Sequence, residues 1–76
     1  MKEDYKMRMI REYRDLKDRR DRLHQLLVKH KAGLLDFELS CPLSLLREQL
    51  RIMDDYLTVL EARSILEQVR LDSEVE

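Results

Sequence analysis

The sequence is poor in residues that cross-link or interrupt a chain. Its 76 residues include one cysteine, one glycine, one proline and no tryptophan, and only 5% are aromatic. Cys41 has no partner for a disulfide within the chain, and a lone reduced thiol is typical of a cytoplasmic protein. With so few helix breakers we expect long helices, interrupted only where Gly33 and Pro42 lie.

The sequence also lacks the clusters on which catalysis or metal binding depends. His24 and His30 are six residues apart with no cluster of Cys or His beside them, so we expect no metal site. No serine, cysteine or pair of carboxylates stands in a spacing typical of a nucleophile and its base. No apolar run approaches the ~18 residues that span a membrane, and no signal-peptide pattern opens the chain. We therefore expect a cytoplasmic protein that is not an enzyme, needs no cofactor and has no membrane partner.

Charge is divided unequally along the chain. Residues 1–31 hold eleven Lys or Arg against six Asp or Glu, a balance of +5, and residues 32–76 hold four against ten, a balance of −6. The two add to the net charge of −1. The basic half favours either an acidic partner helix within the chain or a bound anion such as a nucleotide. We do not expect DNA as a partner, because several basic residues between Arg8 and Arg22 have aspartates four residues away and leave little unopposed charge.

Hydrophobic periodicity predicts a first helix over residues 4–31. Its key positions recur at alternating steps of four and three, which keeps one stripe facing a single neighbouring helix. This stripe comprises Met9, Tyr13, Leu16, Arg20, Leu23, Leu27 and His30. Gly33 favours an end just beyond Lys31, because glycine readily takes the left-handed conformation of a helix C-cap.

A second helix is expected over residues 42–70, with Pro42 in its first turn. Either Ser40 or Cys41 is expected as the cap, and Ser40 has the better acceptor. It carries two adjacent apolar stripes. The first comprises Leu46, Leu50, Met53, Leu57 and Leu60; the second, the outer stripe, comprises Leu45, Ile52, Tyr56 and Val59. In the loop of residues 32–41, we expect Leu35, Phe37 and Leu39 to close the end of the hairpin. The acidic tail of residues 72–76 is expected to fray.

These segments predict an all-α fold: one domain, residues 1–76, in which two long antiparallel helices form a hairpin. The first helix can cover only one stripe of the second, so the outer stripe of a lone hairpin stays in water. Burial of apolar surface contributes about 0.8 kcal/mol of stability per CH₂ group. If the four side chains of the outer stripe stay in water, the hairpin loses this contribution for several CH₂ groups. We therefore expect an obligate homo-oligomer, a helical bundle of coiled-coil type, with an interface of Leu45, Ile52, Tyr56, Val59 and Arg63.

Antiparallel pairing across the loop brings together residues whose numbers sum to about 73. Leu16 then faces Leu57, and Arg20, a charge within an apolar stripe, lies near Asp54. One interpretation is an ion pair of Arg20 with Asp54 or Asp55, with the arginine stem along the stripe. The other is an arginine directed at a bound phosphate or at an anion between protomers.

Other polar and aromatic residues on these stripes also have two interpretations. Tyr13 and Tyr56 either pack with the hydroxyl in water or stack on a nucleobase beside cationic donors. Gln49, like Arg63, either sets the register between copies or contacts a ligand between them. His24 is either an interface or surface residue or a ligand contact. The predicted ligand-binding set is Tyr13, Lys17, Arg20, His24, Gln49 and Tyr56.

The strings MIREYRDLKDRRDRLHQLL and CPLSLLREQLRIMDDYLTVLEARSILE resemble small helical proteins of tailed bacteriophages and prophages, including crAss-like phages. The resemblance covers about residues 8–67, with matching positions at Glu12, Tyr13, Leu16, Leu23, Gln49, Met53, Tyr56, Leu57, Leu60 and Arg63. In size and layout the hairpin is also similar to viral sponge proteins that counter CBASS and Thoeris immunity. Those oligomeric hairpins sequester cyclic nucleotide signals between protomers without cleaving them.

The resemblance implies a phage-encoded anti-immune protein in the cytoplasm of an infected bacterium. It would sequester a cyclic nucleotide or another anionic signal at subunit interfaces. The alternative is a small phage adaptor or inhibitor, whose outer stripe docks onto a host defence enzyme or a CRISPR effector. A structural oligomer without a ligand is a third possibility.

Overall fold

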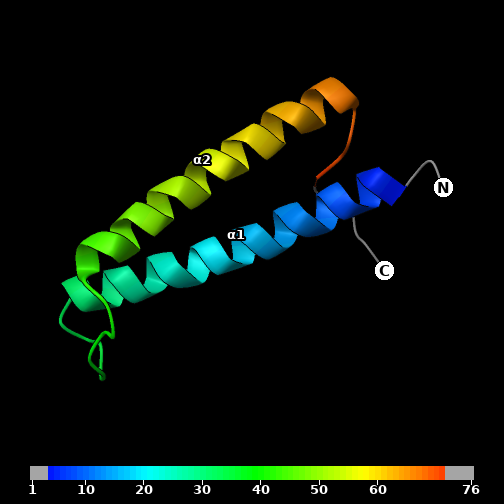
Figure 1. Ribbon diagram of the computed structural model, residues 1–76. Coiled ribbons are helices and arrows are strands. Elements are labelled where there is room, and N and C mark those ends of the chain that lie inside the picture. The colour runs from blue at the N-terminus through cyan, green and yellow to red at the C-terminus, as the bar shows by residue number, and fades with distance from the viewer. Residues whose placement is uncertain (1–3, 72–76) are drawn as a thin grey trace.

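The computed structural model describes residues 4–71 and shows two helices joined by a loop (Figure 1). Helix α1 spans Asp4–Lys31 and helix α2 spans Leu43–Glu67. The helices lie side by side and antiparallel, so the predicted all-α hairpin is confirmed. Neither of these two helices is apolar enough over a sufficient length to cross a membrane.

Helix α1 has the predicted bounds. It ends at Lys31 because Gly33 takes the left-handed conformation, with a φ of +75°. The N–H of Gly33 donates to the carbonyl of His30 at 3.1 Å, and that of Leu34 donates to the carbonyl of Lys29 at 2.8 Å. These bonds satisfy carbonyls that the end of the helix would otherwise leave open. Lys29, His30 and Lys31 also place basic side chains at the negative end of the helix dipole.

Helix α2 begins at Leu43, one residue later than predicted. Pro42 is its N-cap residue, with φ −60° and ψ 143°, and no side chain of the described residues caps this end. A capping role for Ser40 or Cys41 is therefore wrong. The carbonyl of Pro42 accepts from the N–H groups of Leu45 at 3.1 Å and Leu46 at 3.4 Å, which starts the helical hydrogen-bond pattern.

Helix α2 ends at Glu67, three residues before the predicted end. Gln68 takes the left-handed conformation, with φ 58° and ψ 48°, and the N–H of Val69 donates to the carbonyl of Ser64 at 2.8 Å. The chain then turns back toward the N-terminal end of α1 (Figure 1), where Val69 is buried with Ile10. Burial of Val69 thus accompanies the early stop. The predicted acidic tail, residues 72–76, lies outside the described residues.

The hydrophobic core lies at the end of the hairpin opposite the loop. Its buried members are Met9, Ile10, Leu16, Leu57, Leu60 and Val69, with Tyr13, Met53 and Leu71 packed against them. Toward the loop, Leu23, Leu27, Leu46 and Leu50 are only half-buried, and His30 is exposed. The radius of gyration is 15.4 Å, against about 11 Å for a compact chain of this length. The hairpin is therefore elongated, and its loop end is the less densely packed one.

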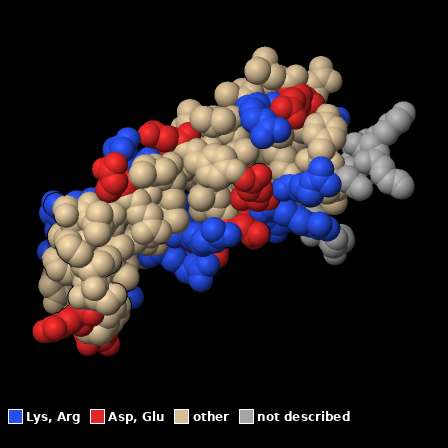
Figure 2. Space-filling view, in the orientation of Figure 1, with Lys and Arg blue, Asp and Glu red and all other residues tan. Residues whose placement is uncertain are grey.

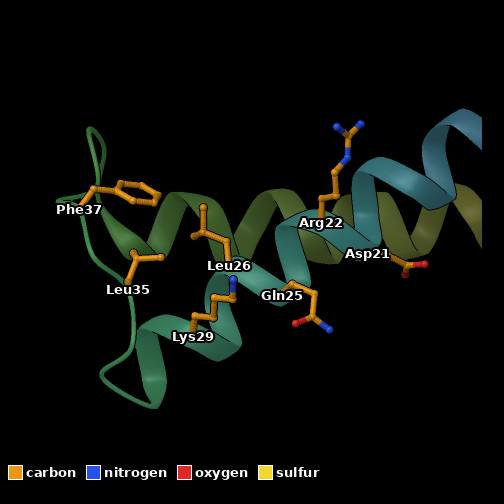
Figure 3. A pocket seen from close by; sticks show the side chains of 7 residues that line it. All are labelled: Asp21, Arg22, Gln25, Leu26, Lys29, Leu35 and Phe37. Atoms are coloured by element: carbon orange, nitrogen blue, oxygen red, sulfur yellow. The ribbon is translucent and has the colours of Figure 1, made fainter.

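The loop, residues 32–42, differs from the prediction at its aromatic residue. Leu35 and Leu39 are half-buried, whereas Phe37 is 56% exposed. Phe37 does not close the hairpin, because its ring points toward Leu26 of α1 and lines a pocket whose walls, within the described residues, include no residue of α2 (Figure 3). The prediction that Phe37 closes the end of the hairpin is therefore wrong.

The outer stripe of α2 lies in solvent. Its four residues, Leu45, Ile52, Tyr56 and Val59, are 42–59% exposed. Figure 2 shows uncharged side chains in a continuous area along α2 and over the loop, with charged side chains at its edges. Helix α1 covers only the first stripe, as the sequence predicts, and leaves an apolar face on the other flank of α2.

Candidate functional site

Two contacts between charged or polar side chains fix the register of the helices. Arg20 Nε donates to Asp54 Oδ1 at 2.7 Å, and the hydroxyl of Tyr13 donates to Glu61 Oε2 at 2.9 Å. Each pair of residue numbers sums to 74, one more than the predicted register. Of the two interpretations of Arg20, the structure shows the ion pair that was expected with Asp54 or Asp55, and the partner is Asp54.

Four of the predicted ligand-binding residues share one face of α1. Tyr13, Lys17, Arg20 and His24 follow one another at steps of four and three residues, which keeps them on one side of a helix. The Lys17 ammonium lies 3.8 Å from Asp21, and Arg20 Nη1 lies 3.3 Å from the same side chain. Carboxylates therefore already surround the cations in the middle of this face.

The same contacts set the ionisation of Tyr13 and Arg20. Burial raises the pKa of the Tyr13 hydroxyl, and the hydrogen bond to Glu61 raises it further. The hydrogen bond to Asp54 raises the pKa of the Arg20 guanidinium. Tyr13 is thus a neutral donor at neutral pH, and Arg20 is a cation whose Nε is already engaged. A phosphate can bind Arg20 only through its other nitrogens or by displacing Asp54.

Gln49 and Tyr56 lie on the other flank of α2. Asp54 and Glu61 are the α2 residues that bind side chains of α1. Gln49 precedes Asp54 by five residues and Tyr56 precedes Glu61 by five, and five residues correspond to a rotation of about 140° around the helix. Within one chain the structure therefore does not bring Gln49 and Tyr56 to Arg20. A ligand that contacts Arg20 of one chain together with Gln49 and Tyr56 would have to lie between two copies.

An open hollow of about 440 Å³ lies next to His24, near the loop. Leu27 and Val28 supply apolar walls from α1, and Lys31 and Arg47 add cations from α1 and α2. Within residues 4–71 no carboxylate pairs with Lys31 or Arg47. This hollow is the part of the face where positive charge is not already neutralised.

The hollow is suited to an anion that carries an apolar or flat part. Lys31 and Arg47 supply charged donors, and the imidazole of His24 supplies a ring N–H. Leu27 and Val28 offer apolar contact, and the volume lies within the usual range of ligand sites, about 300–1,000 Å³. In the part of the chain that the structure describes, no group of three His, Cys, Asp or Glu side chains is placed to hold a metal ion.

Two residues of this hollow, Lys31 and Arg47, are absent from the predicted set. Signals for both exist in the sequence. Lys31 follows His24 by seven residues, which places it on the same face of α1. Arg47 and Leu27 have numbers that sum to 74, so the register of the hairpin places them opposite each other.

The predicted interface residues form a continuous flank on α2. Gln49, Tyr56 and Arg63 are spaced by seven residues beside the apolar members of the outer stripe, and all are exposed. Arg63 Nε donates to Glu67 Oε2 at 3.0 Å. The flank thus offers an aromatic ring, an amide and a paired guanidinium within an apolar surface.

A family model described as Sequestin matches residues 3–65. The match spans α1, the loop and α2 as far as Ile65, and so includes every residue predicted to bind a ligand. No curated protein and no solved structure matches the chain.

Proposed function

The chain belongs to the Sequestin family, and we propose that it is a phage-encoded anti-immune protein that holds a cyclic nucleotide-type immune signal without cleaving it. The family name refers to sequestration, which is the action of a binding protein rather than of a catalyst. Such a protein acts by lowering the concentration of free ligand. It needs affinity and a slow release rate, and it needs no turnover.

The hollow of His24, Lys31 and Arg47 is the observation that supports an anionic ligand best. Elsewhere on the same face Lys17 and Arg20 are held by Asp21 and Asp54. At the hollow two cations face solvent beside apolar walls without a carboxylate partner among residues 4–71. A phosphate there gains charge-assisted hydrogen bonds and displaces no existing ion pair.

The outer stripe supports a ligand site between copies. Four exposed apolar side chains on one flank of a long helix favour a second copy, because burial removes them from water. Tyr56 lies at the centre of this flank, with Gln49 and Arg63 seven residues to either side. In a homo-oligomer built on this flank, Tyr56 supplies a ring for base stacking, and the amide and guanidinium supply polar contacts.

Native mass spectrometry of the purified protein, with and without a panel of cyclic di- and trinucleotides, tests the proposal. We expect an oligomer that gains whole-number ligand masses and releases the intact nucleotide after denaturation. A variant with Lys31→Ala and Arg47→Ala should lose retention and keep the oligomer. Its matched control, Arg11→Ala with Arg14→Ala, removes the same charge from exposed positions outside the hollow. Release of cleaved nucleotide, or no retention of any member of the panel, would contradict the proposal.

The exposed outer stripe also favours a second candidate, an adaptor that binds one host protein. This function predicts a complex of fixed stoichiometry with a host defence enzyme or CRISPR effector and no bound nucleotide. Ile52→Glu should abolish that complex, because it places a charge in the centre of the stripe. A wild-type oligomer that ignores the nucleotide panel and forms such a complex would favour the adaptor.

A further inference from the structure

A second pocket lies at the loop end of the hairpin, on the side of α1 that faces away from α2. It has a volume of about 300 Å³ and is bounded by the C-terminal half of α1 and by the loop. Figure 3 shows Phe37 and Leu35 extending from the loop toward Leu26 on α1. Neither the register contacts of the hairpin nor the hollow at His24 uses these side chains.

The walls of this pocket are apolar and include a flat ring. Leu26 and Leu35 are half-buried, and Phe37 is more exposed than either, at 56%. Phe37 is exposed to solvent beside Leu26 and Leu35, and together they form an apolar surface that a bound group can cover. The exposed ring of Phe37 favours a flat aromatic partner, because aromatic groups stack face to face with an offset.

One cation borders the apolar walls. The ammonium of Lys29 lies beside Leu26 in Figure 3, and within residues 4–71 no carboxylate pairs with it. The other charged groups of the lining are engaged elsewhere. Arg22 is bound to Asp18 at 3.0 Å, and Asp21 contacts Lys17 and Arg20. The pocket therefore combines an apolar interior with a single available positive charge.

We infer that this pocket binds the flat ring of a mononucleotide-sized anion, with the ring on Phe37 and the phosphate at Lys29. The inference rests on the ligand class of the proposed function and adds a second place where the chain holds such a ligand. Stacking on Phe37 between Leu26 and Leu35 supplies apolar contact, and Lys29 supplies a charged donor. A volume of about 300 Å³ is at the small end of ligand sites, which favours one base over a cyclic dinucleotide.

Titration of the ¹⁵N-labelled protein with AMP, adenosine and ribose 5-phosphate tests this inference by NMR. We expect AMP to shift the amide signals of Leu26, Leu35 and Phe37. Adenosine should shift the same signals with lower affinity, and ribose 5-phosphate should bind more weakly still. Shifts confined to the hollow of His24 would overturn the inference. Concentration-dependent shifts at Phe37 without any nucleotide would also overturn it, because they would assign the pocket to a second copy of the chain.

Substitutions separate the ring contact from the charge contact. Phe37→Ala should weaken AMP and adenosine alike by about tenfold or more, the usual loss when a stacking side chain is truncated. Lys29→Ala should weaken AMP and leave adenosine unchanged. Leu34→Ala is the matched loop control, because Leu34 is 73% exposed and does not line the pocket. Unchanged AMP binding by Phe37→Ala, in a protein whose remaining amide signals are native, would contradict the inference.

The outcome is distinguishable from that of the proposed function. AMP shifts at Phe37 in a protein that retains no cyclic nucleotide would support the pocket and refute sequestration of those signals. Conversely, retention of a cyclic nucleotide that depends on Lys31 and Arg47, with no AMP shift at Phe37, would support the proposed function and refute the pocket.

Discussion

Arg20 on α1 and Asp54 on α2 are joined by a 2.7 Å hydrogen bond between Nε and Oδ1, although 34 residues separate them in the sequence. The Arg20 side chain is 26% exposed and that of Asp54 is 47% exposed. An ion pair that reaches water on one side gains little from Coulomb attraction, because solvent screens it. Its main structural effect is to specify the register of the two helices.

We expect a double-mutant cycle of Arg20→Met and Asp54→Asn to give a coupling free energy of about 1 kcal/mol or less, falling with added salt. Urea unfolding at low and high salt, at one fixed protein concentration, measures it. The control is the pair Asp18 and Arg22, which lies within α1 and is more exposed, and which should couple by only a few tenths of a kcal/mol. A coupling free energy of about 3 kcal/mol or more for Arg20 and Asp54, the range of a buried pair, would contradict the solvent-screened pair described above.

The ionisation of Tyr13 gives a second prediction. Burial is the largest single cause of its raised pKa, followed by the hydrogen bond to Glu61 and by the charges of Glu61 and Asp21. Tyr13 should therefore titrate above the ordinary tyrosine value of about 10, and Glu61→Gln should move its pKa only part of the way back. The raised pKa contributes stability that is present below about pH 10 and is lost as the pH rises through the folded-state pKa.

Carbon-13 NMR of labelled tyrosine rings measures this pKa, with Tyr13→Phe to assign the signal. A full return of the pKa to the ordinary value in Glu61→Gln would contradict the contribution of burial. In Tyr13→Phe this part of the alkaline loss of stability should disappear from the pH profile.

Removing a glycine after α1 and introducing one after α2 should have opposite effects on the free energy of unfolding. Gly33 has a φ of +75° and Gln68 a φ of 58°, a region that only glycine enters without strain. A Cβ at Gly33 would meet nothing within 4 Å, so Gly33→Ala tests the backbone alone and should destabilise by about 1 kcal/mol. Gln68→Gly should stabilise by about 0.5–1 kcal/mol. Thermal unfolding measures both, and equal effects of the same sign would refute the assigned conformations.

The sequence predicted the parts of this fold that depend on local chemistry. A single glycine beyond an uninterrupted periodic segment was enough to place the end of α1 at Lys31. Antiparallel geometry then predicted the partner of Arg20 to within one residue, because few positions of α2 face it. The exposure of the outer stripe was also predictable, because α2 has two apolar stripes and α1 can cover only one of them.

The sequence did not predict features that depend on contacts between distant segments. Residues 68–70 have no strong helix breaker, and the burial of Val69 with Ile10 accompanies the early end of α2. Ile10 itself lies about 100° around α1 from Met9, outside the predicted stripe, and becomes buried where the returning segment packs. The outward position of Phe37 depends on the path of the loop, which alternation of apolar residues cannot specify.

The last prediction is that copies of the chain assemble, and that they do so through the outer stripe of α2. We expect Ile52→Glu to dissociate the oligomer, because a buried unpaired carboxylate in an apolar interface carries a large desolvation penalty. Ile65→Glu is the matched control: Ile65 is an isoleucine of the same helix, 77% exposed, on the opposite flank. Sedimentation velocity should show wild type and Ile65→Glu as the same oligomer and Ile52→Glu as a protomer of about 9.3 kDa.

The same two variants connect assembly to ligand binding. If the ligand lies between copies at Tyr56, Ile52→Glu should lose the nucleotide together with the oligomer, whereas Ile65→Glu should keep both. A protomeric Ile52→Glu that still retains the nucleotide would place the ligand within one chain, at the hollow of His24, Lys31 and Arg47. A wild-type protein that sediments as a protomer would refute the assembly itself, and dissociation by Ile65→Glu alone would move the interface to the other flank of α2.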